Sequence, residues 1–401
     1  MYTYKFRLYP TKEQEVLLAK HFGVNRFLYN YFLANRIDTY QFGGVSSSFY
    51  GDCKEVTYLK SREELAWLRE VNSQSLQQTL KDLDGAYNKF FEGLAKFPNF
   101  KSKKNARQSF RVPQSIEIEN NRLCIPKFKG GLKIKLHRPV EGKIRNCTVS
   151  RHSSGQYHVS IAVERVNTIP QTKTRKAVGV DVGVKDLAIL SDGKRYGNPK
   201  YSRSLQQRKS LLQRRLKRKQ LGSKNRGKLN RQIAKITLCA TNQRTNHLHQ
   251  VSHRVTKENQ LVVTEDLAVA NMVHNHKLAY ALSDVSLGEF QRQLEYKSAW
   301  RGGQLEKVDR FYPSSKTCSA CGWIHQGLKL EHRTWTCGQC QTHHDRDLNA
   351  ARNILWYGLE KLGVERPDVK ASGLPNYGRS LAKSLRSSGR LNEEARYFSA
   401  E

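Results

Sequence analysis

The chain has 401 residues, of which 70 are Lys or Arg and 35 are Asp or Glu, so its formal net charge is +35. This length suits two or three domains. The mean hydropathy of −0.70, without any run near the ~18 apolar residues of a membrane span, argues against a membrane protein, and we expect no secretory signal. Because such a charge repels itself in a folded chain, it predicts a polyanionic partner, either nucleic acid or an anionic membrane.

The first hundred residues predict one strand followed by helices. Residues 2–9 alternate in polarity and end at a proline, and the stretch from Thr11 to Gln14 has the spacing of a capping box. Apolar residues recur at intervals of three and four across 17–32 and again across 76–94, with a Gly/Ser loop between these stretches. This spacing is typical of helices that face a core, so we expect a helical region over 10–96.

The hydrophobic period changes to two over residues 109–164. Short alternating segments are separated by turn clusters such as Gly130-Gly131. This pattern predicts an antiparallel sheet, closed into a small barrel, that the first strand can join with the helices as an insertion.

A third region opens at Ala177 with the sequence AVGVDVGVKDLAILSDG, which predicts two strands joined by a tight turn near Gly183. The stretch 193–257 then holds nineteen Lys and Arg and not one Asp or Glu. Leucines and isoleucines at helical spacing lie on both sides of Gly222, so this stretch predicts a basic helical hairpin rather than a tail.

The remaining elements follow in a clear order. We expect a strand at 261–264, a helix at 290–300, a strand near Val308 and a helix at 348–359. From residue 363 onward the sequence is rich in Ser, Gly and Arg without a period, which predicts a disordered tail.

Four of the eight cysteines form two CxxC pairs with fifteen residues between them. They are Cys318, Cys321, Cys337 and Cys340. Four thiolates at this spacing predict a closed, tetrahedral zinc site with a structural role. Two disulfides are the alternative, which a reducing compartment disfavours. His343 and His344 lie close enough to replace a cysteine, although four thiolates already fill the coordination shell.

A set of acidic residues lies at the ends of predicted elements. Asp181 is on the first strand of the third region, Glu265 ends the strand LVVTE, and Asp345 and Asp347 precede the last helix. An RNase H-type fold brings carboxylates together in this way, and two divalent cations about 4 Å apart then support phosphodiester hydrolysis. Each acid alone could equally be a helix cap or a turn residue, and the spacing does not choose between Asp345 and Asp347.

Six motifs in this order resemble one known family. They are YKFRLYPTKEQ at 4–14, KFPNFKSKKNARQSFR at 96–111, GVDVGVKDLAILSDG at 179–193, TEDL at 264–267, YPSSKTCSACG at 312–322 and HDRDLNAARNIL at 344–355. Together they are similar to the TnpB family, RNA-guided DNA endonucleases encoded by insertion sequences and related to compact type V CRISPR effectors. The motifs span nearly the whole chain up to about residue 360.

The resemblance implies a multidomain α+β architecture: an RNase H-like (RuvC) nuclease domain with an inserted zinc ribbon, and an N-terminal wedge β-barrel that carries a helical recognition domain. The implied boundaries are 1–9 and 97–168 for the barrel, 10–96 for the recognition domain, 169–176 for a linker, 177–309 and 342–362 for the nuclease domain, 310–341 for the zinc ribbon and 363–401 for the tail.

The resemblance also assigns roles. It places the catalytic, magnesium-binding carboxylates on Asp181, Glu265 and Asp347, with Asp345 as a neighbour. It implies one structural Zn²⁺, two Mg²⁺ ions, a guide RNA, and a double-stranded DNA target beside a short motif. We expect a monomer with one RNA, in the cytoplasm and nucleoid of a bacterium or archaeon, without a membrane partner.

Three stretches are candidate nucleic-acid contacts. The basic hairpin can follow a phosphate backbone, and the stretch 96–111 combines cations with aromatic rings that either stack bases or anchor the core. The start of the helix after Asn72 offers side chains that can read base edges. The candidate residues are Ser73, Gln74, Gln77, Lys101, Lys103, Lys104, Arg107, Arg214, Arg215, Lys217, Arg218 and Lys219.

Two other functions remain open at this point. One is an RNA-guided or plain DNA-binding regulator without cleavage, against which the three intact carboxylates count. The other is a transposase that joins strands through a tyrosine beside a histidine pair; His247 and His249 have that spacing, but no tyrosine follows before Tyr280. For these histidines and His253 we expect a structural or RNA-facing role.

Overall fold

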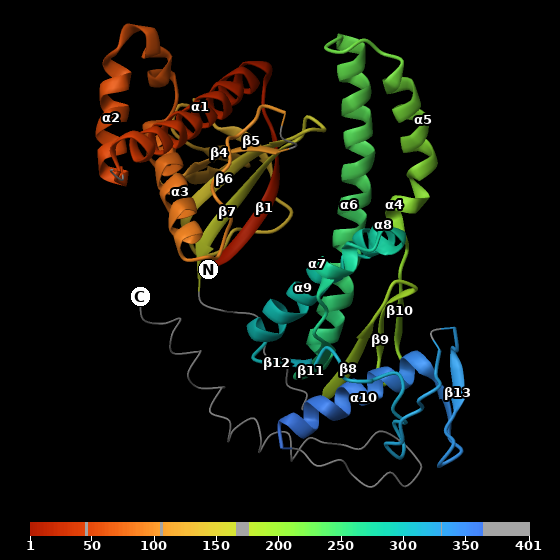
Figure 1. The fold of residues 1–401 in the computed structure, drawn as a ribbon. Coiled ribbons are helices and arrows are strands. Elements are labelled where there is room, and N and C mark those ends of the chain that lie inside the picture. Colours follow the sequence, from red (N-terminus) through yellow and green to blue (C-terminus); the bar gives the residue numbers. More distant parts are fainter. Residues whose placement is uncertain (45–46, 105–106, 166–175, 330, 364–401) are drawn as a thin grey trace. The chain divides into compact units, whose positions relative to one another are not determined.

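The computed structural model describes residues 1–44, 47–104, 107–165, 176–329 and 331–363. The chain divides into two units, the first with residues 1–166 and 220–234 and the second with residues 167–219 and 235–401 (Figure 1). Apart from Lys176 and Gly363, the expected linker and tail lie outside the described residues. No helix in the described ranges is long and apolar enough to cross a membrane.

The first unit contains a seven-stranded antiparallel sheet in the order β2-β6-β7-β1-β5-β4-β3 (Figure 1). The strands are β1 (Tyr2–Tyr9), β2 (Arg107–Val112), β3 (Glu117–Glu119), β4 (Arg122–Cys124), β5 (Leu132–Lys135), β6 (Lys143–His152) and β7 (Tyr157–Glu164). The first strand does join the later strands, because β1 pairs with β5 on one side and β7 on the other.

Two features of this sheet differ from the sequence-based expectation. The strand β6 had no clear alternation because its register shifts between Ile144 and Asn146, which interrupts the period of two. The short strand β3 and the strand β2 are the two edges, and no ladder joins them in the described residues. Strand pairing therefore does not close the expected barrel.

The helices of the first unit lie between β1 and β2 in the chain. They are α1 (Lys12–Gly43), α2 (Phe49–Ser61), the 3₁₀ helix η1 (Glu63–Glu70) and α3 (Ser73–Phe91). The predicted capping box is confirmed, with Thr11 accepting from the backbone of Gln14. The buried residues Leu28, Phe32 and Leu80 belong to the core that these helices share.

The second unit is built on a five-stranded sheet in the order β10-β9-β8-β11-β12. The strands are β8 (Ala177–Val182), β9 (Asp186–Leu190), β10 (Arg195–Gly197), β11 (Leu261–Glu265) and β12 (Gln304–Val308). Strands β8, β11 and β12 are mutually parallel, whereas β9 and β10 are antiparallel neighbours. The carboxyl ends of parallel strands lie at the same end of a sheet, and Asp181 and Glu265 lie at that end here.

The helices that follow in the chain are α4 (Tyr201–Ser204), α5 (Gln206–Lys217), α6 (Lys224–Glu258), α7 (Val269–Val273), α8 (His276–Val285), α9 (Leu287–Trp300) and α10 (Arg346–Lys361), and the first turns of α6 fall in the first unit. Within the second unit, α6 and α9 pack on one face of the sheet and α10 packs on the other. Val180 and Val262 pack with α6 and α9, whereas Val263 packs with α10 through Ile354 and Leu355. The helical prediction for the basic stretch is confirmed by α5 and α6. Helices α7 and α8 lie between the expected strand at 261–264 and the expected helix at 290–300, where no helix was predicted.

Two glycines let α10 approach the sheet closely. A Cβ on Gly179 of β8 would lie 2.1 Å from the carbonyl oxygen of Ala351 and 2.6 Å from the backbone nitrogen of Leu355. A Cβ on Gly358 of α10 would lie 2.5 Å from Val263 Cγ1 on β11. The helix that carries Asp347 is thus in backbone contact with the strand that carries Asp181, and only glycine allows this at residue 179.

We expect Gly179→Ala to lower the free energy of unfolding by about 3 kcal/mol, because the added methyl group meets backbone atoms that cannot rotate away. The matched control is Gly288→Ala in α9, where a Cβ meets nothing within 4 Å. We expect the control to be unchanged or more stable by up to about 1 kcal/mol. Calorimetric unfolding of both variants checks this, and equal stability would contradict it.

Candidate active site and zinc cluster

Three predicted carboxylates lie on the side of the second unit's sheet that α10 covers. Asp181 is on β8, where Val180 and Val182 point to the opposite face and are buried there. Glu265 is the last residue of β11, which runs parallel to β8. Asp347 is in the first turn of α10. Elements far apart in the chain therefore bring these three acids to one end of the sheet.

Asp181 is the electrostatic centre of this group. Burial, followed by the carboxylates of Glu265 and Asp347, raises the pKa of Asp181 well above its ordinary value. The guanidinium of Arg346 acts in the opposite direction without cancelling the effect. Neighbouring carboxylates thus disfavour the ionised form of Asp181. A divalent cation would offset this effect, because its positive charge favours the ionised form.

Glu265 is held at both its side chain and its backbone. Its Oε1 accepts a hydrogen bond of 2.8 Å from Ser314 Oγ, and its carbonyl oxygen accepts one of 2.8 Å from Gln291 Nε2. Asp266, the next residue, pairs instead with Arg310 at 2.7 Å. This supports the expectation that Glu265, and not Asp266, belongs to the acidic group.

The structure gives Asp345 and Asp347 different surroundings. Asp345 is the N-cap of α10: its Oδ1 accepts from the Leu348 N–H at 2.9 Å and pairs with Arg195 at 2.9 Å. Burial raises the pKa of Asp345, but these two hydrogen bonds outweigh it, so the pKa lies below its ordinary value. Asp347 forms a longer ion pair with Arg333, at 3.8 Å. Asp347 is therefore the more available cation ligand of the two.

The carboxylates of Asp181, Glu265 and Asp347 could hold divalent cations, because carboxylate oxygens are the ligands that Mg²⁺ prefers.

The four predicted cysteines form one cluster. Their Sγ atoms all lie within 4.8 Å of one another, and the distances from Cys318 to Cys340 and from Cys321 to Cys337 are both 3.6 Å. Four sulfurs about 2.3 Å from one tetrahedral zinc would be separated by about 3.8 Å, so the thiols fit this metal without rearrangement. All four cysteines are free thiols, which disfavours the alternative of two disulfides.

His344 lies directly against this cluster. Its Nε2 is 3.0 Å from Cys318 Sγ, and its buried ring packs 4.7 Å from the ring of Trp335. A two-stranded sheet of β13 (Thr334–Thr336) and β14 (His343–Asp345) holds both residues. His344 is thus placed to donate a hydrogen bond to a metal-bound thiolate, and the same strand leads directly into α10 and Asp347.

The chain matches three family models. Residues 158–276 match one described as "Probable transposase", residues 288–354 match the "Cas12f1-like, TNB domain", and residues 1–44 match a "Helix-turn-helix domain". A protein of Streptomyces pristinaespiralis, named "Putative RNA-guided DNA endonuclease", is 41% identical over 368 residues that cover 89% of each chain. The chain belongs to the TnpB family.

Other members and one solved structure are also similar. A relative from Escherichia coli K12, named "Putative RNA-guided DNA endonuclease InsQ", is 34% identical over 372 residues that cover 88% of this chain and 92% of that one. The solved structure of a Cas12f1–sgRNA–target DNA complex has 16% identity, covers 86% of this chain and 83% of its own, and has a TM-score of 0.49. In this TnpB-family chain, residues 1–44 form one strand and one continuous helix rather than a helix-turn-helix.

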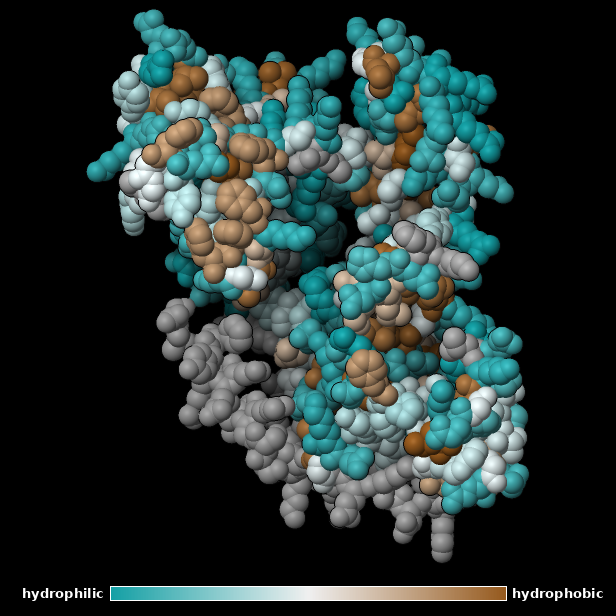
Figure 2. Space-filling model, viewed as in Figure 1, coloured by the Kyte–Doolittle hydropathy of each residue, from teal (hydrophilic) through white to brown (hydrophobic). Residues whose placement is uncertain are grey.

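The five predicted cations of the basic hairpin are exposed. Arg214, Arg215 and Lys217 end α5, and Arg218 and Lys219 follow it. Figure 2 shows hydrophilic side chains over α5. No residue of α5 is fully buried, so this helix contributes more cationic surface than core.

The start of α3 presents polar side chains, as predicted. Its N-cap, Asn72, is a further polar residue that the sequence analysis did not list as a candidate. Ser73 and Gln77 are exposed, and Ser73 Oγ accepts from Lys60 at 3.0 Å. Gln74 Oε1 and Asn72 Nδ2 are both buried without a hydrogen-bond partner in the described residues. Asn72 is the N-cap of α3, with its side-chain Oδ1 bound to the Gln74 N–H. Only the packing reveals that the rest of this amide is unused.

The aromatic and basic stretch before β2 divides into core and surface. Phe110 is a core residue, whereas Phe97 and Phe100 are exposed. Lys101 Nζ lies 3.6 Å from the centre of the Tyr29 ring, in a cation–π contact. The other cations of this stretch that were predicted to contact nucleic acid are exposed: Lys103, Lys104 and Arg107.

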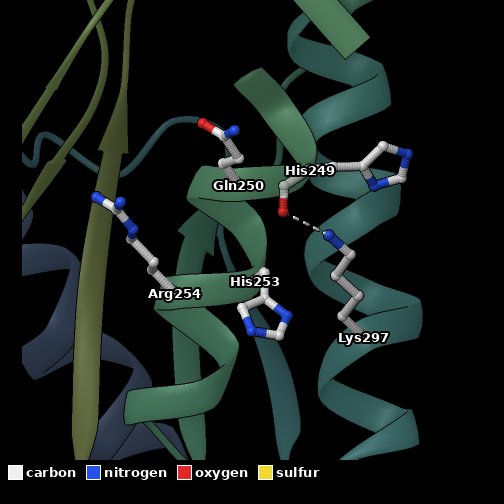
Figure 3. A pocket seen from close by; sticks show the side chains of 5 residues that line it. All are labelled: His249, Gln250, His253, Arg254 and Lys297. Carbon is white, nitrogen blue, oxygen red and sulfur yellow. Dashed lines mark hydrogen bonds between the residues drawn. The ribbon is translucent and has the colours of Figure 1, made fainter. Parts of the chain in front are cut away.

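The histidines of α6 belong to a basic hollow rather than a metal site. A cavity of about 330 Å³ is lined by His249, Gln250, His253, Arg254 and Lys297 (Figure 3). Lys297 Nζ donates to the His249 carbonyl at 2.9 Å, and burial and Arg301 lower the pKa of Lys297 to about 8. The side chains fan out from α6 and α9 instead of converging on one point (Figure 3). This arrangement suits a phosphate backbone better than a cation.

Asp181→Asn should raise the Tm of the metal-free protein at neutral pH. The raised pKa means that the ionised carboxylate destabilises the folded state above that pKa, and the neutral amide removes this cost. The difference should shrink as the pH falls through the Asp181 pKa, because the wild-type side chain then takes up a proton. Thermal unfolding in magnesium-free buffer measures both. Asp266→Asn, which loses an exposed ion pair, should show no such rise.

We expect the purified protein to contain about one zinc per chain, because four thiolates complete its coordination shell. Cys337→Ser should lose most of this zinc and lower the Tm, whereas Cys239→Ser, which changes an exposed cysteine outside the cluster, should change neither. Elemental analysis of both variants measures the content. A full zinc complement in Cys337→Ser would contradict the four-cysteine site.

Proposed function

We propose that this protein is an RNA-guided endonuclease that cuts double-stranded DNA beside a short sequence motif. The observation that carries the proposal is the group of Asp181, Glu265 and Asp347, which backbone contact at Gly179 brings to one end of the sheet. Membership of a family whose relatives are named RNA-guided DNA endonucleases supports it. The transposon origin that one family model suggests is part of the same proposal.

The three carboxylates would hold two Mg²⁺ ions at the target phosphodiester. When bound, the ions supply an activated water and stabilise the leaving oxygen of an in-line attack. Arg346, whose charge acts on Asp181, is placed to limit the excess negative charge before the ions enter. The cysteine cluster would hold one Zn²⁺ with a structural role only.

Nucleic acids would occupy the cationic surfaces of both units. The exposed cations of α5 can neutralise successive phosphates, which makes binding salt-dependent. Ser73 and Gln77, which are exposed at the start of α3, would be the side chains that read base edges. Base pairing with the guide RNA would read the rest of the target. A monomer with one RNA, acting in the bacterial or archaeal cytoplasm, completes the proposal.

A regulator that binds DNA through its RNA without cutting is the alternative. The three neighbouring carboxylates, which together with burial raise the pKa of Asp181, argue against it. A protein that only binds DNA gains nothing from carboxylates that repel one another. A transposase that uses a histidine pair is not supported, because His247 and His249 lie on a helix and His247 contacts the Gly197 carbonyl at 3.1 Å.

Glu265→Gln should reduce cleavage at least about a hundredfold, because the amide cannot hold a metal ion as a carboxylate does. The measurement is cleavage of matched linear DNA by the protein purified with its RNA, in the presence of Mg²⁺. The matched control is Asp266→Asn, which loses the adjacent carboxylate and should stay close to wild type.

Binding of RNA and DNA by Glu265→Gln should remain unchanged in a mobility-shift assay. If the wild type binds its matched target but leaves it intact under all divalent cations tried, the regulator is the correct function. If both variants cut equally, Glu265 is not a ligand of the catalytic cations.

A further inference from the structure

Glu265 is connected to the cysteine cluster by one short segment, residues 314–319. Ser314 begins this segment and donates from Oγ to Glu265 Oε1 at 2.8 Å. Cys318, near its other end, is one of the four clustered thiols. Ser314 itself is only 6% exposed, so this hydrogen bond is shielded from water. The residue that binds the Glu265 carboxylate and a candidate zinc ligand, Ser314 and Cys318, therefore lie only four residues apart along the chain.

Two asparagines of α10 hold the same segment along its length. Asn353 Nδ2 donates to the carbonyl oxygens of Ser314 at 2.8 Å and Thr317 at 2.6 Å. Asn349 Nδ2 donates to the Thr317 carbonyl at 2.7 Å, and its Oδ1 accepts from the Ser319 N–H at 2.8 Å. Both asparagines are 1% exposed. They satisfy backbone groups that would otherwise be buried without partners, which is costly.

The asparagines are also fixed to Asp347, because all three belong to α10. Asn349 is two residues and Asn353 six residues beyond Asp347, so a rigid helix joins them. The segment 314–319 is thus bonded to Glu265 at its start and to the helix of Asp347 along its length. These contacts set the distance between the carboxylates of Glu265, on β11, and Asp347, on α10.

We propose that Ser314 is a positioning residue for Glu265. Its hydroxyl fixes Oε1 so that Oε2 can bind a divalent cation, while Asn353 fixes Ser314 relative to Asp347. The proposal rests on the proposed function in one respect only, that Glu265 binds a divalent cation. Residues that hydrogen-bond to metal ligands orient them and strengthen metal binding, which is the role inferred for Ser314.

The test is Mn²⁺ binding by the full chain without nucleic acid, with free Mn²⁺ measured by electron paramagnetic resonance. Ser314→Ala should weaken binding about tenfold or more, the usual effect of removing such a partner. The matched control is Ser315→Ala, which removes the neighbouring hydroxyl and should bind as wild type does. Ser314→Cys keeps the size of the side chain but is a weaker donor, so it should fall between wild type and Ser314→Ala.

Cleavage gives a second, independent readout. Ser314→Ala should need about tenfold more Mg²⁺ for half-maximal cutting but approach the wild-type rate at saturating Mg²⁺, whereas a loss of folding would lower the rate at every concentration. Equal Mn²⁺ affinity in Ser314→Ala and Ser315→Ala overturns the proposal. If the wild type binds Mn²⁺ but cuts nothing, the proposed function fails, while the Mn²⁺ comparison still decides the role of Ser314.

Discussion

The backbone of α10 lies directly against the backbone of β8 at Gly179, and the candidate active site depends on this contact. A side chain of any size at residue 179 would meet the Ala351 carbonyl at 2.1 Å, so the helix could not come as near. At this crossing the first turn of α10 places Asp347 within electrostatic reach of Asp181. Gly179 thus controls how closely Asp347 of α10 can approach Asp181, whereas the pairing of β11 with β8 places Glu265.

The close crossing also concentrates negative charge, and the structure balances that charge only in part. Asp345 is satisfied by the helix N-terminus and Arg195, and Asp266 by Arg310. The pKa of Asp181 stays raised, because burial and the charges of Glu265 and Asp347 disfavour its ionised form in the metal-free fold. The chain has a net charge of +35, so most of its surface would repel metal cations. This small acidic group is the place where they would bind.

Polar contacts join the cysteine cluster to the same region. Asn349 and Asn353 of α10 hold the segment that carries Cys318, and His344 links Cys318 to the strand that enters α10. A zinc ion in the cluster would do no chemistry itself, but it would fix a segment whose first residue touches Glu265. The cysteine cluster and the candidate active-site carboxylate Glu265 are therefore parts of one hydrogen-bonded framework.

Much of the fold could be predicted because local periodicity reports which face of an element is buried. The strand 2–9, the capping box at Thr11, the basic hairpin and the strand of Glu265 appear as expected. The strand β6 was not anticipated because a bulge interrupts its alternation, and barrel closure is a question of edge pairing that no local pattern encodes. The disordered tail and most of the linker lie outside the described residues and stay predictions.

The sequence by itself determined the residue types of the site: the four cysteines at zinc spacing, the acids at element ends, and the acid-free run of cations. Spacing alone could not separate Asp345 from Asp347, and the resemblance to known relatives made that choice. The tertiary structure shows different surroundings for the two acids, because Asp345 caps α10 and Asp347 forms a longer ion pair with Arg333. The role of Asp347 as a cation ligand stays a prediction. Ser314, Asn349 and Asn353 likewise acquire their role only in the fold, since a hydrogen bond between residues 49 positions apart has no period to detect.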